Sequence, residues 1–134
     1  MSEQESLKRL ALISIAVMLI LGVASMAVGA TLENYRARYL LMLLGGIVVV
    51  DSAVYLPIVY ARREDPRRIA VPALQSLWIS TSMGLGYLVT APAPYFQLSK
   101  ALEAFMAVVG AIMLVYGLYS LLAISRRSGV PLAV

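Results

Sequence analysis

A single carboxylate stands in the middle of an apolar stretch of this 134-residue chain. Asp51 is the one charged residue between positions 40 and 60, a run long enough to cross a lipid bilayer. A carboxylate at that depth is costly unless it is paired, hydrogen-bonded, protonated or in contact with water. Two chemistries therefore fit Asp51: a proton or cation site, or a protonated group that clamps one helix to another.

Other polar side chains fall at a similar depth in the same and later apolar runs. Helical rise is about 1.5 Å per residue, which places Asp51 near the centre of its run and Tyr55 one turn away on the same face. The later runs contribute an amide and three hydroxyls at comparable depth: Gln75, Ser76, Ser80 and Tyr116. We expect these side chains to meet around one polar pocket, either as co-ligands of a carried proton or ion, or as the hydrogen-bond partners of a clamp.

The elements that must position this pocket are membrane-spanning helices. Hydrophobic residues make up 61% of the chain and charged residues 13%, with a mean hydropathy of +0.86, whereas soluble domains are about one-quarter charged. Four apolar runs, at 10–32, 40–60, 69–89 and 101–124, each approach the ~20 residues that a spanning helix needs. We predict an all-α polytopic membrane protein, with residues 1–134 forming a single four-transmembrane-helix bundle. Its helices should cover about 7–32, 39–60, 69–89 and 98–124.

The basic residues predict the orientation of the bundle. Of the 11 Lys and Arg residues, eight fall on one predicted side: Lys8, Arg9, Arg62, Arg63, Arg67, Arg68, Arg126 and Arg127. The positive-inside rule then puts both termini in the cytoplasm of a cell that inserts the chain into its plasma membrane. The four arginines between the second and third runs, Arg62, Arg63, Arg67 and Arg68, set this topology and could contact anionic lipid head groups. Aromatic residues are expected to form a belt at the opposite boundary: Tyr35, Tyr39, Tyr87, Tyr95 and Phe96.

Small residues predict where the helices pack closely. Ser25 and Gly29 lie one turn apart in the first run, and Ser76, Ser80 and Gly84 form a similar stripe in the third. Stripes of this kind allow the backbones of two membrane helices to approach each other. Pro57 lies inside the second run, where it removes a backbone hydrogen bond and should kink the helix.

The two halves of the chain resemble each other. Residues 25–29 (SMAVG) match residues 82–86 (SMGLG), and Gly45 followed by Arg62 matches Gly110 followed by Arg126. Such matches are typical of a tandem duplication of a two-helix hairpin, with the two copies running parallel through the membrane. In this alignment Asp51 falls opposite Tyr116, so the polar site would be asymmetric.

The composition also excludes several functions. The chain has neither Cys nor His, which excludes thiolate chemistry, His-ligated haem and most zinc or copper sites, and we expect no cofactor. The arginines and lysines lie in short loops, so the positive net charge indicates topology and not nucleic-acid binding. A high Arg to Lys ratio and a single Asn fit a thermophilic or GC-rich prokaryote.

Three hypotheses for function follow. The first is a non-catalytic membrane subunit that packs beside other membrane subunits within a larger complex, such as a respiratory complex. The second is a small ion- or proton-coupled transporter or channel, homo-oligomeric because four helices enclose little space, with Asp51 as the carrier. The third is an enzyme acting on a lipid or quinone, which has the least support because no activated nucleophile or metal site is present. A sealed Asp51 would favour the subunit, and a water-accessible Asp51 would favour the transporter.

Overall fold

The protein is built from four long α-helices. The computed structural model describes residues 3–62 and 65–132, and every regular element within them is helical. The elements in order are α1 (Glu3–Ala30), α2 (Tyr35–Ala61), α3 (Pro66–Thr90), the short 3-10 turn η1 (Pro94–Phe96) and α4 (Lys100–Ser128). The all-α prediction is confirmed. Compared with the predicted bounds, the helices extend further at the start of α1, at both ends of α2 and α3, and at the end of α4. α1 ends two residues before its predicted bound, and α4 begins two residues after its own.

Polar side chains determine where the helices begin. Asn34, Asp65 and Ser99 each precede a helix in an extended conformation and accept a hydrogen bond from a backbone N–H of the first turn. Pro66 occupies the first position of α3, where its missing N–H has no intrahelical partner to lose. α4 ends at Gly129, whose φ of 73° lies in the left-handed region that glycine adopts without strain.

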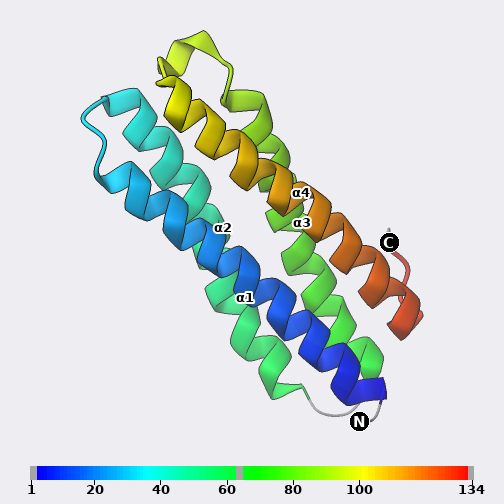
Figure 1. The fold of residues 1–134 in the computed structure, drawn as a ribbon. Helices are drawn as coiled ribbons and strands as arrows, with labels where there is room; N and C mark the ends of the chain where they lie inside the picture. Colours follow the sequence, from blue (N-terminus) through cyan, green and yellow to red (C-terminus); the bar gives the residue numbers. More distant parts are fainter. Residues whose placement is uncertain (1–2, 63–64, 133–134) are drawn as a thin grey trace.

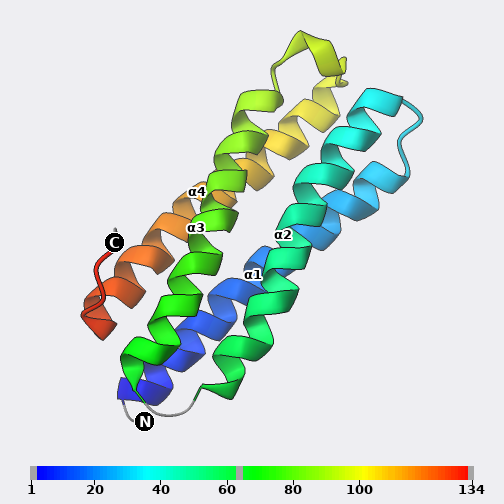
Figure 2. The same cartoon turned by 180° about the vertical axis from the view of Figure 1, so that it is seen from behind.

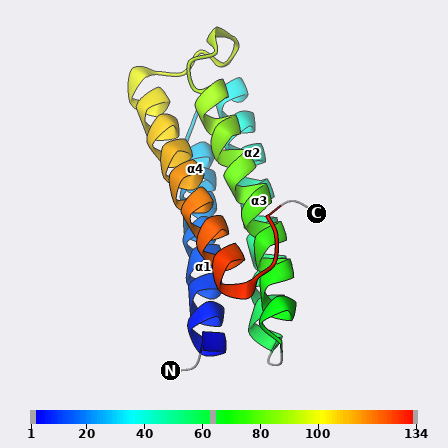
Figure 3. The same ribbon diagram turned by 90° about the vertical axis from the view of Figure 1, so that its right-hand side faces the viewer.

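The helices form two antiparallel hairpins that lie side by side (Figures 1 and 2). α1 pairs with α2 and α3 pairs with α4, while the hairpins meet through α2 against α3, α1 against α4, and α1 against α3. α2 and α4 therefore occupy opposite corners of the bundle, as the side view of Figure 3 also shows. The start of α1, the end of α2, the start of α3 and the end of α4 share one end, here called the basic end. The other end, here called the aromatic end, carries Tyr35, Tyr39, Tyr95 and Phe96.

Each hairpin is closed by a pair of facing glycines. A Cβ atom added to Gly45 would lie 2.8 Å from the carbonyl oxygen of Gly22, and one added to Gly110 would lie 2.7 Å from that of Gly84. Real Cβ atoms essentially never approach oxygen that closely, so only glycine permits the backbones to touch at these crossings. The two hairpins therefore share the same mode of closure, at Gly22 with Gly45 and at Gly84 with Gly110.

Three of the four helices are long and apolar enough to cross a membrane. They cover Glu5–Ala30, Tyr35–Ala61 and Lys100–Ser128. α3 is less apolar because a stretch of amide and hydroxyl residues interrupts it: Gln75, Ser76, Ser80, Thr81 and Ser82. Three of these polar side chains, on Ser76, Ser80 and Thr81, are buried against the other helices. The chain is thus a membrane protein by the length and composition of α1, α2 and α4, with α3 packed among them.

Candidate functional site

Asp51 is buried in the middle of α2, at the contact with α3. Its side chain is 8% exposed, and its Oδ2 atom accepts a hydrogen bond of 2.9 Å from the hydroxyl of Ser76 on α3. The second carboxyl oxygen, Oδ1, has no partner among the described residues. The carboxyl group therefore has one firm hydrogen bond, and that bond joins the two hairpins.

Ser80 lies one turn further along α3, toward the aromatic end. It is close enough to interact with the Asp51 carboxyl group, but its hydroxyl lacks a hydrogen bond of good geometry within the described part of the chain. Asp51 is thus hydrogen-bonded to one hydroxyl of α3 and lies near a second. Among residues 3–62 and 65–132 there is no group of three or more His, Cys, Asp or Glu side chains that could hold a metal ion. The surroundings suit a hydrogen-bonded or protonated carboxyl group better than a divalent cation site.

Tyr55 and Gln75 form a separate pair at the outer edge of the same α2–α3 contact. The Tyr55 hydroxyl lies 3.4 Å from Oε1 of Gln75, which is a long hydrogen bond. Gln75 is exposed and Tyr55 is partly buried. These two side chains extend the polar contact from buried Asp51 to the surface of the bundle, one turn closer to the basic end.

Tyr116 lies apart from the other predicted site residues. It lines a groove of about 520 Å³ on the outer face of α4, together with Ala111, Ile112, Val115 and Tyr119. α2 and α4 occupy opposite corners of the bundle, so side chains at the same depth on these helices do not meet. The expectation of one pocket shared by all six residues is therefore corrected: five lie along the α2–α3 contact, and Tyr116, which is partly buried, lines the groove on α4.

A second buried polar pair joins the hairpins on the opposite side. The hydroxyls of Ser14 on α1 and Ser120 on α4 are hydrogen-bonded at 2.9 Å, and both residues are fully buried. Ser14 also lies 2.8 Å from the carbonyl oxygen of Leu10, one turn earlier in its own helix. Each of the two outer hairpin contacts, α2–α3 and α1–α4, thus contains one buried hydrogen bond between side chains.

Further buried hydroxyls have no hydrogen-bond partner in the described part of the chain. Ser52, Thr81 and Tyr87 are buried, and their oxygen atoms have no hydrogen bond among the described residues. The Tyr87 hydroxyl lies near Ser25, whose own hydroxyl donates to the carbonyl oxygen of Leu21 at 3.0 Å. Unpaired buried polar groups are uncommon in native interiors and call for an explanation.

The predicted packing residues lie at close helix contacts. A Cβ atom on Gly29 would lie 2.9 Å from Leu41 of α2, and one on Gly84 would lie 2.8 Å from Met113 of α4. Ser25, Ser76 and Ser80 are buried at the contacts between helices. The structure adds four further close approaches, at Gly22, Gly45, Gly110 and Gly117.

Several buried polar residues were not predicted. The burial of Ser14, Ser52 and Thr81 was not predicted, because the sequence does not show which face of an apolar helix a hydroxyl residue occupies. Tyr87 was expected in the aromatic belt, yet its side chain is fully buried between the helices. Its hydroxyl lies near Ser25 but forms no hydrogen bond among the described residues, so no polar contact explains its burial. Tyr35, Tyr39 and Tyr95 are exposed at the aromatic end.

The four arginines between α2 and α3 lie at the basic end or outside the described residues. Arg62 is exposed and its N–H closes the last turn of α2. Arg67 is exposed, and its N–H donates to the side chain of Asp65 at 3.0 Å. Arg68 is exposed and engaged in an interaction, and Arg63 lies outside the described residues.

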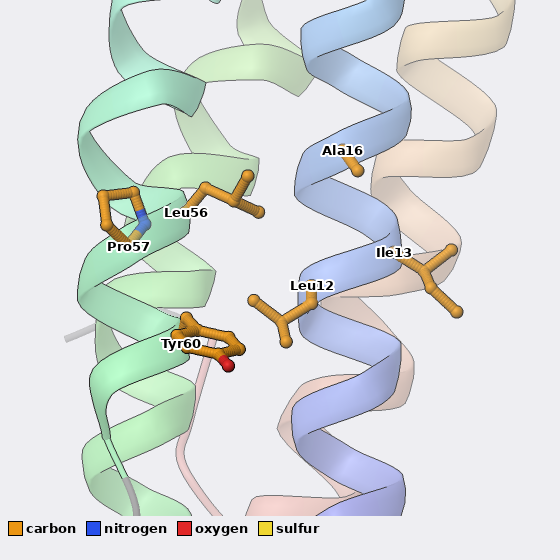
Figure 4. Close-up of a pocket in the computed structure, with 6 residues that line it drawn as sticks. All are labelled: Leu12, Ile13, Ala16, Leu56, Pro57 and Tyr60. Atoms are coloured by element: carbon orange, nitrogen blue, oxygen red, sulfur yellow. The ribbon is translucent and has the colours of Figure 1, made fainter.

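Three surface grooves formed by the described residues lie away from Asp51. One of about 470 Å³ runs between α1 and α2 and is lined by Leu12, Ile13, Ala16, Leu56, Pro57 and Tyr60 (Figure 4). Another, of about 270 Å³, lies at the aromatic end, where Arg36 stacks over the ring of Tyr95 with 4.5 Å between its Cζ atom and the ring centroid. Asp51 lines neither of these, nor the groove on α4.

Searches against protein-family models, curated proteins and solved structures find no match to this chain. Its function is therefore inferred from the geometry alone.

Proposed function

We propose that this chain is a non-catalytic membrane subunit that packs beside other membrane-embedded chains in a larger complex. In this proposal the bundle crosses the membrane four times, with both termini in the cytoplasm. Its buried polar residues hold the two hairpins together and carry no substrate.

α3 serves as the fourth membrane span. Its 25 residues correspond to roughly 37 Å of helix, which exceeds the ~30 Å hydrocarbon thickness of a bilayer. Its hydroxyls on Ser76, Ser80 and Thr81 are buried, while Ile79, Leu85 and Val89 are exposed. The three buried hydroxyls therefore do not meet lipid, whereas Gln75 and Ser82 are exposed. The basic end faces the cytoplasm because eight of the 11 basic residues of the sequence lie on that side.

The sealing of Asp51 carries the proposal. A carrier site needs a path to water, whereas Asp51 is 8% exposed, bonded to Ser76 and absent from the lining of the grooves described above. A hydrogen bond between two helices is a common use of a polar residue in membranes. Asp51 accordingly acts as a clamp between α2 and α3, with Ser14 and Ser120 as its counterpart between α1 and α4.

The outer face of α4 is the surface that we assign to the neighbouring subunit. Tyr119 is 61% exposed there, although it lies five residues, or ~7 Å, from the middle of α4. A tyrosine hydroxyl at that depth in lipid has no hydrogen-bond partner, which a neighbouring chain can supply. Ala104 and Ala111 are exposed on the same helix and would allow another helix to approach closely.

The hairpins are best explained as a tandem duplication. The glycine crossings support this, because Gly45 and Gly110 occupy equivalent places in the two hairpins, as their sequence match predicts. By the same comparison Gly22 of α1 is equivalent to Gly84 of α3. This equivalence differs by five residues from the alignment of the SMAVG and SMGLG segments.

Purification from native membranes at native expression level tests the subunit proposal. A subunit is expected to migrate with other chains in a fixed ratio in a mild detergent. Recovery of a monodisperse assembly of this chain alone would contradict the proposal.

A proton- or ion-coupled transporter is the second candidate, and the unpaired hydroxyls favour it. Oδ1 of Asp51 and the hydroxyls of Ser52, Ser80, Thr81 and Tyr87 have no hydrogen bond in the described residues, so water or a carried proton could engage them. An Asp51→Asn variant in liposomes separates the two candidates. Loss of a proton- or ion-linked flux that the wild type supports would favour the transporter.

A further inference from the structure

The groove between α1 and α2 opens toward the basic end of the bundle. The two helices touch at Gly22 and Gly45 and lie further apart below this crossing (Figures 1 and 2). Side chains from both helices line the resulting space of about 470 Å³: Leu12, Ile13 and Ala16 from α1, with Leu56, Pro57 and Tyr60 from α2 (Figure 4). Apart from the Tyr60 hydroxyl, all of these side chains are hydrocarbon. The groove is within the size range of small-ligand sites, about 300–1,000 Å³.

A cation lies at the basic end of this groove. The Nζ atom of Lys8 lies 5.1 Å from the ring centroid of Tyr60, in the range of a cation–π contact. Arg9 follows Lys8 on α1, and Arg62 follows the end of α2 two residues beyond Tyr60; both are exposed. The acidic residues of α1, Glu3 and Glu5, lie in its first turn, before these cations. Hydrocarbon side chains thus lead directly to a positively charged rim.

We infer that this groove binds one acyl chain of an anionic phospholipid, with the lipid phosphate against Lys8. Lys8 precedes the apolar run by two residues and Leu12 lies one turn beyond it on the same face, which is the order of phosphate and acyl chain in a lipid leaflet. The contact with Tyr60 holds the Lys8 ammonium group at the mouth of the groove. Basic pockets between membrane helices on the cytoplasmic side commonly bind anionic head groups.

The shape of the groove favours a lipid chain over another helix. A docking helix needs small residues along the contact so that the backbones can approach. Five of the six lining side chains are large or cyclic, and Ala16 is the one small residue. Leu12 and Leu56 reach into the gap from opposite sides (Figure 4), which leaves a slot suited to a flexible hydrocarbon chain.

Fluorescence quenching by brominated lipids tests this site. A Trp78→Phe background removes the single tryptophan of the chain, and Ile13→Trp then places a reporter at the edge of the groove. Val108→Trp provides a matched reporter on the lipid-facing surface of α4, since Val108 and Ile13 have similar exposure, at 57% and 50%. Each variant is reconstituted in phosphatidylcholine vesicles that contain increasing fractions of brominated phosphatidylglycerol or brominated phosphatidylcholine.

Half-quenching of the groove reporter should need a roughly fivefold lower fraction of brominated phosphatidylglycerol than of brominated phosphatidylcholine. A fivefold ratio corresponds to ~1 kcal/mol, which is the contribution of one basic residue to binding an anionic lipid. The Val108→Trp reporter should show no such preference. Lys8→Gln should bring the two lipids to nearly equal quenching, whereas Lys100→Gln at the aromatic end should leave the preference unchanged. Ala16→Leu, which fills the groove without changing its charge, should weaken quenching by both lipids at the groove reporter.

Equal quenching by the two lipids at Ile13→Trp, or a preference that survives Lys8→Gln, would overturn the inference. Protection of Ile13→Trp from both lipids, with Val108→Trp still quenched, would also overturn it, because a protein segment would then occupy the groove. None of these outcomes bears on the subunit proposal, which concerns the face of α4.

Discussion

The hydroxyl of Ser76 donates a hydrogen bond of 2.9 Å to Oδ2 of Asp51, and this bond joins α3 of one hairpin to α2 of the other. Ser14 and Ser120 form the corresponding contact between α1 and α4. Inside a membrane, hydrophobic burial does not distinguish the helix interface from lipid, so specific hydrogen bonds and close packing must hold the hairpins in register. Asp51 is interpreted here as part of that framework.

Ser76→Ala should destabilise the bundle, and Asp51→Asn should be tolerated. The first change removes the donor and should lower the free energy of unfolding by about 0.6–1.7 kcal/mol, the range for hydrogen bonds between membrane helices. The second retains an acceptor oxygen for Ser76 in a side chain of the same shape. Reversible unfolding in bicelles measures both. A loss for Asp51→Asn as large as that for Ser76→Ala would contradict the clamp.

Adjacent glycines of α2 provide a matched test of the hairpin crossing. Gly45→Ala places a Cβ atom 2.8 Å from the carbonyl oxygen of Gly22, while Gly46→Ala places one where no atom lies within 4 Å. Gly45→Ala should cost about 1–3 kcal/mol of unfolding free energy through overpacking. Gly46→Ala should be neutral or stabilise by up to ~1 kcal/mol, because alanine is the better helix former. Thermal unfolding in detergent compares them, and similar losses for both would mean that α1 and α2 do not cross at this point.

Thr81→Val separates the subunit from the transporter. Valine keeps the shape of threonine but removes a buried hydroxyl that has no hydrogen bond in the described residues. If Thr81 only packs, the variant should be as stable as the wild type or gain about 1 kcal/mol. Its melting temperature and its ion flux in liposomes should be measured together. A stable variant that loses a wild-type flux would assign the hydroxyl a place in a conduction path.

Single cysteines test the orientation, because the chain has no native cysteine. Thr31→Cys at the aromatic end should react with a membrane-impermeant maleimide added to intact cells. Ala61→Cys at the basic end should react only after the membrane is made permeable. Both positions are exposed, so burial does not confound the comparison. The reverse labelling pattern would contradict the cytoplasmic assignment of the basic end.

The sequence was sufficient to predict that Asp51 and Ser76 lie at the same level of the bundle, but not how the helices are arranged around them. Asp51 and Ser76 were expected to meet because their depths follow from the 1.5 Å rise along apolar runs. Tyr116 lies at a compatible depth, but depth does not reveal that α2 and α4 occupy opposite corners.

The orientation of individual side chains could not be predicted from the sequence either. Lipid-facing and buried positions of a membrane helix are equally apolar, so little in the pattern marks the faces of Ser14, Thr81 or Tyr87. Tyr87 shows the consequence: its place near the end of an apolar run predicts the aromatic belt, while the structure buries it near Ser25.

Photo-crosslinking from the outer face of α4 tests the subunit proposal most directly. A photoreactive amino acid replaces Val115, which is 68% exposed beside Tyr116 and Tyr119, and a second variant carries it at Ile20, which is 66% exposed on α1. After irradiation of native membranes, position 115 should yield one adduct of fixed mass with a different membrane chain, and position 20 should yield mainly lipid adducts. Adducts at position 115 with lipid alone, or with a second copy of this chain alone, would contradict the proposal.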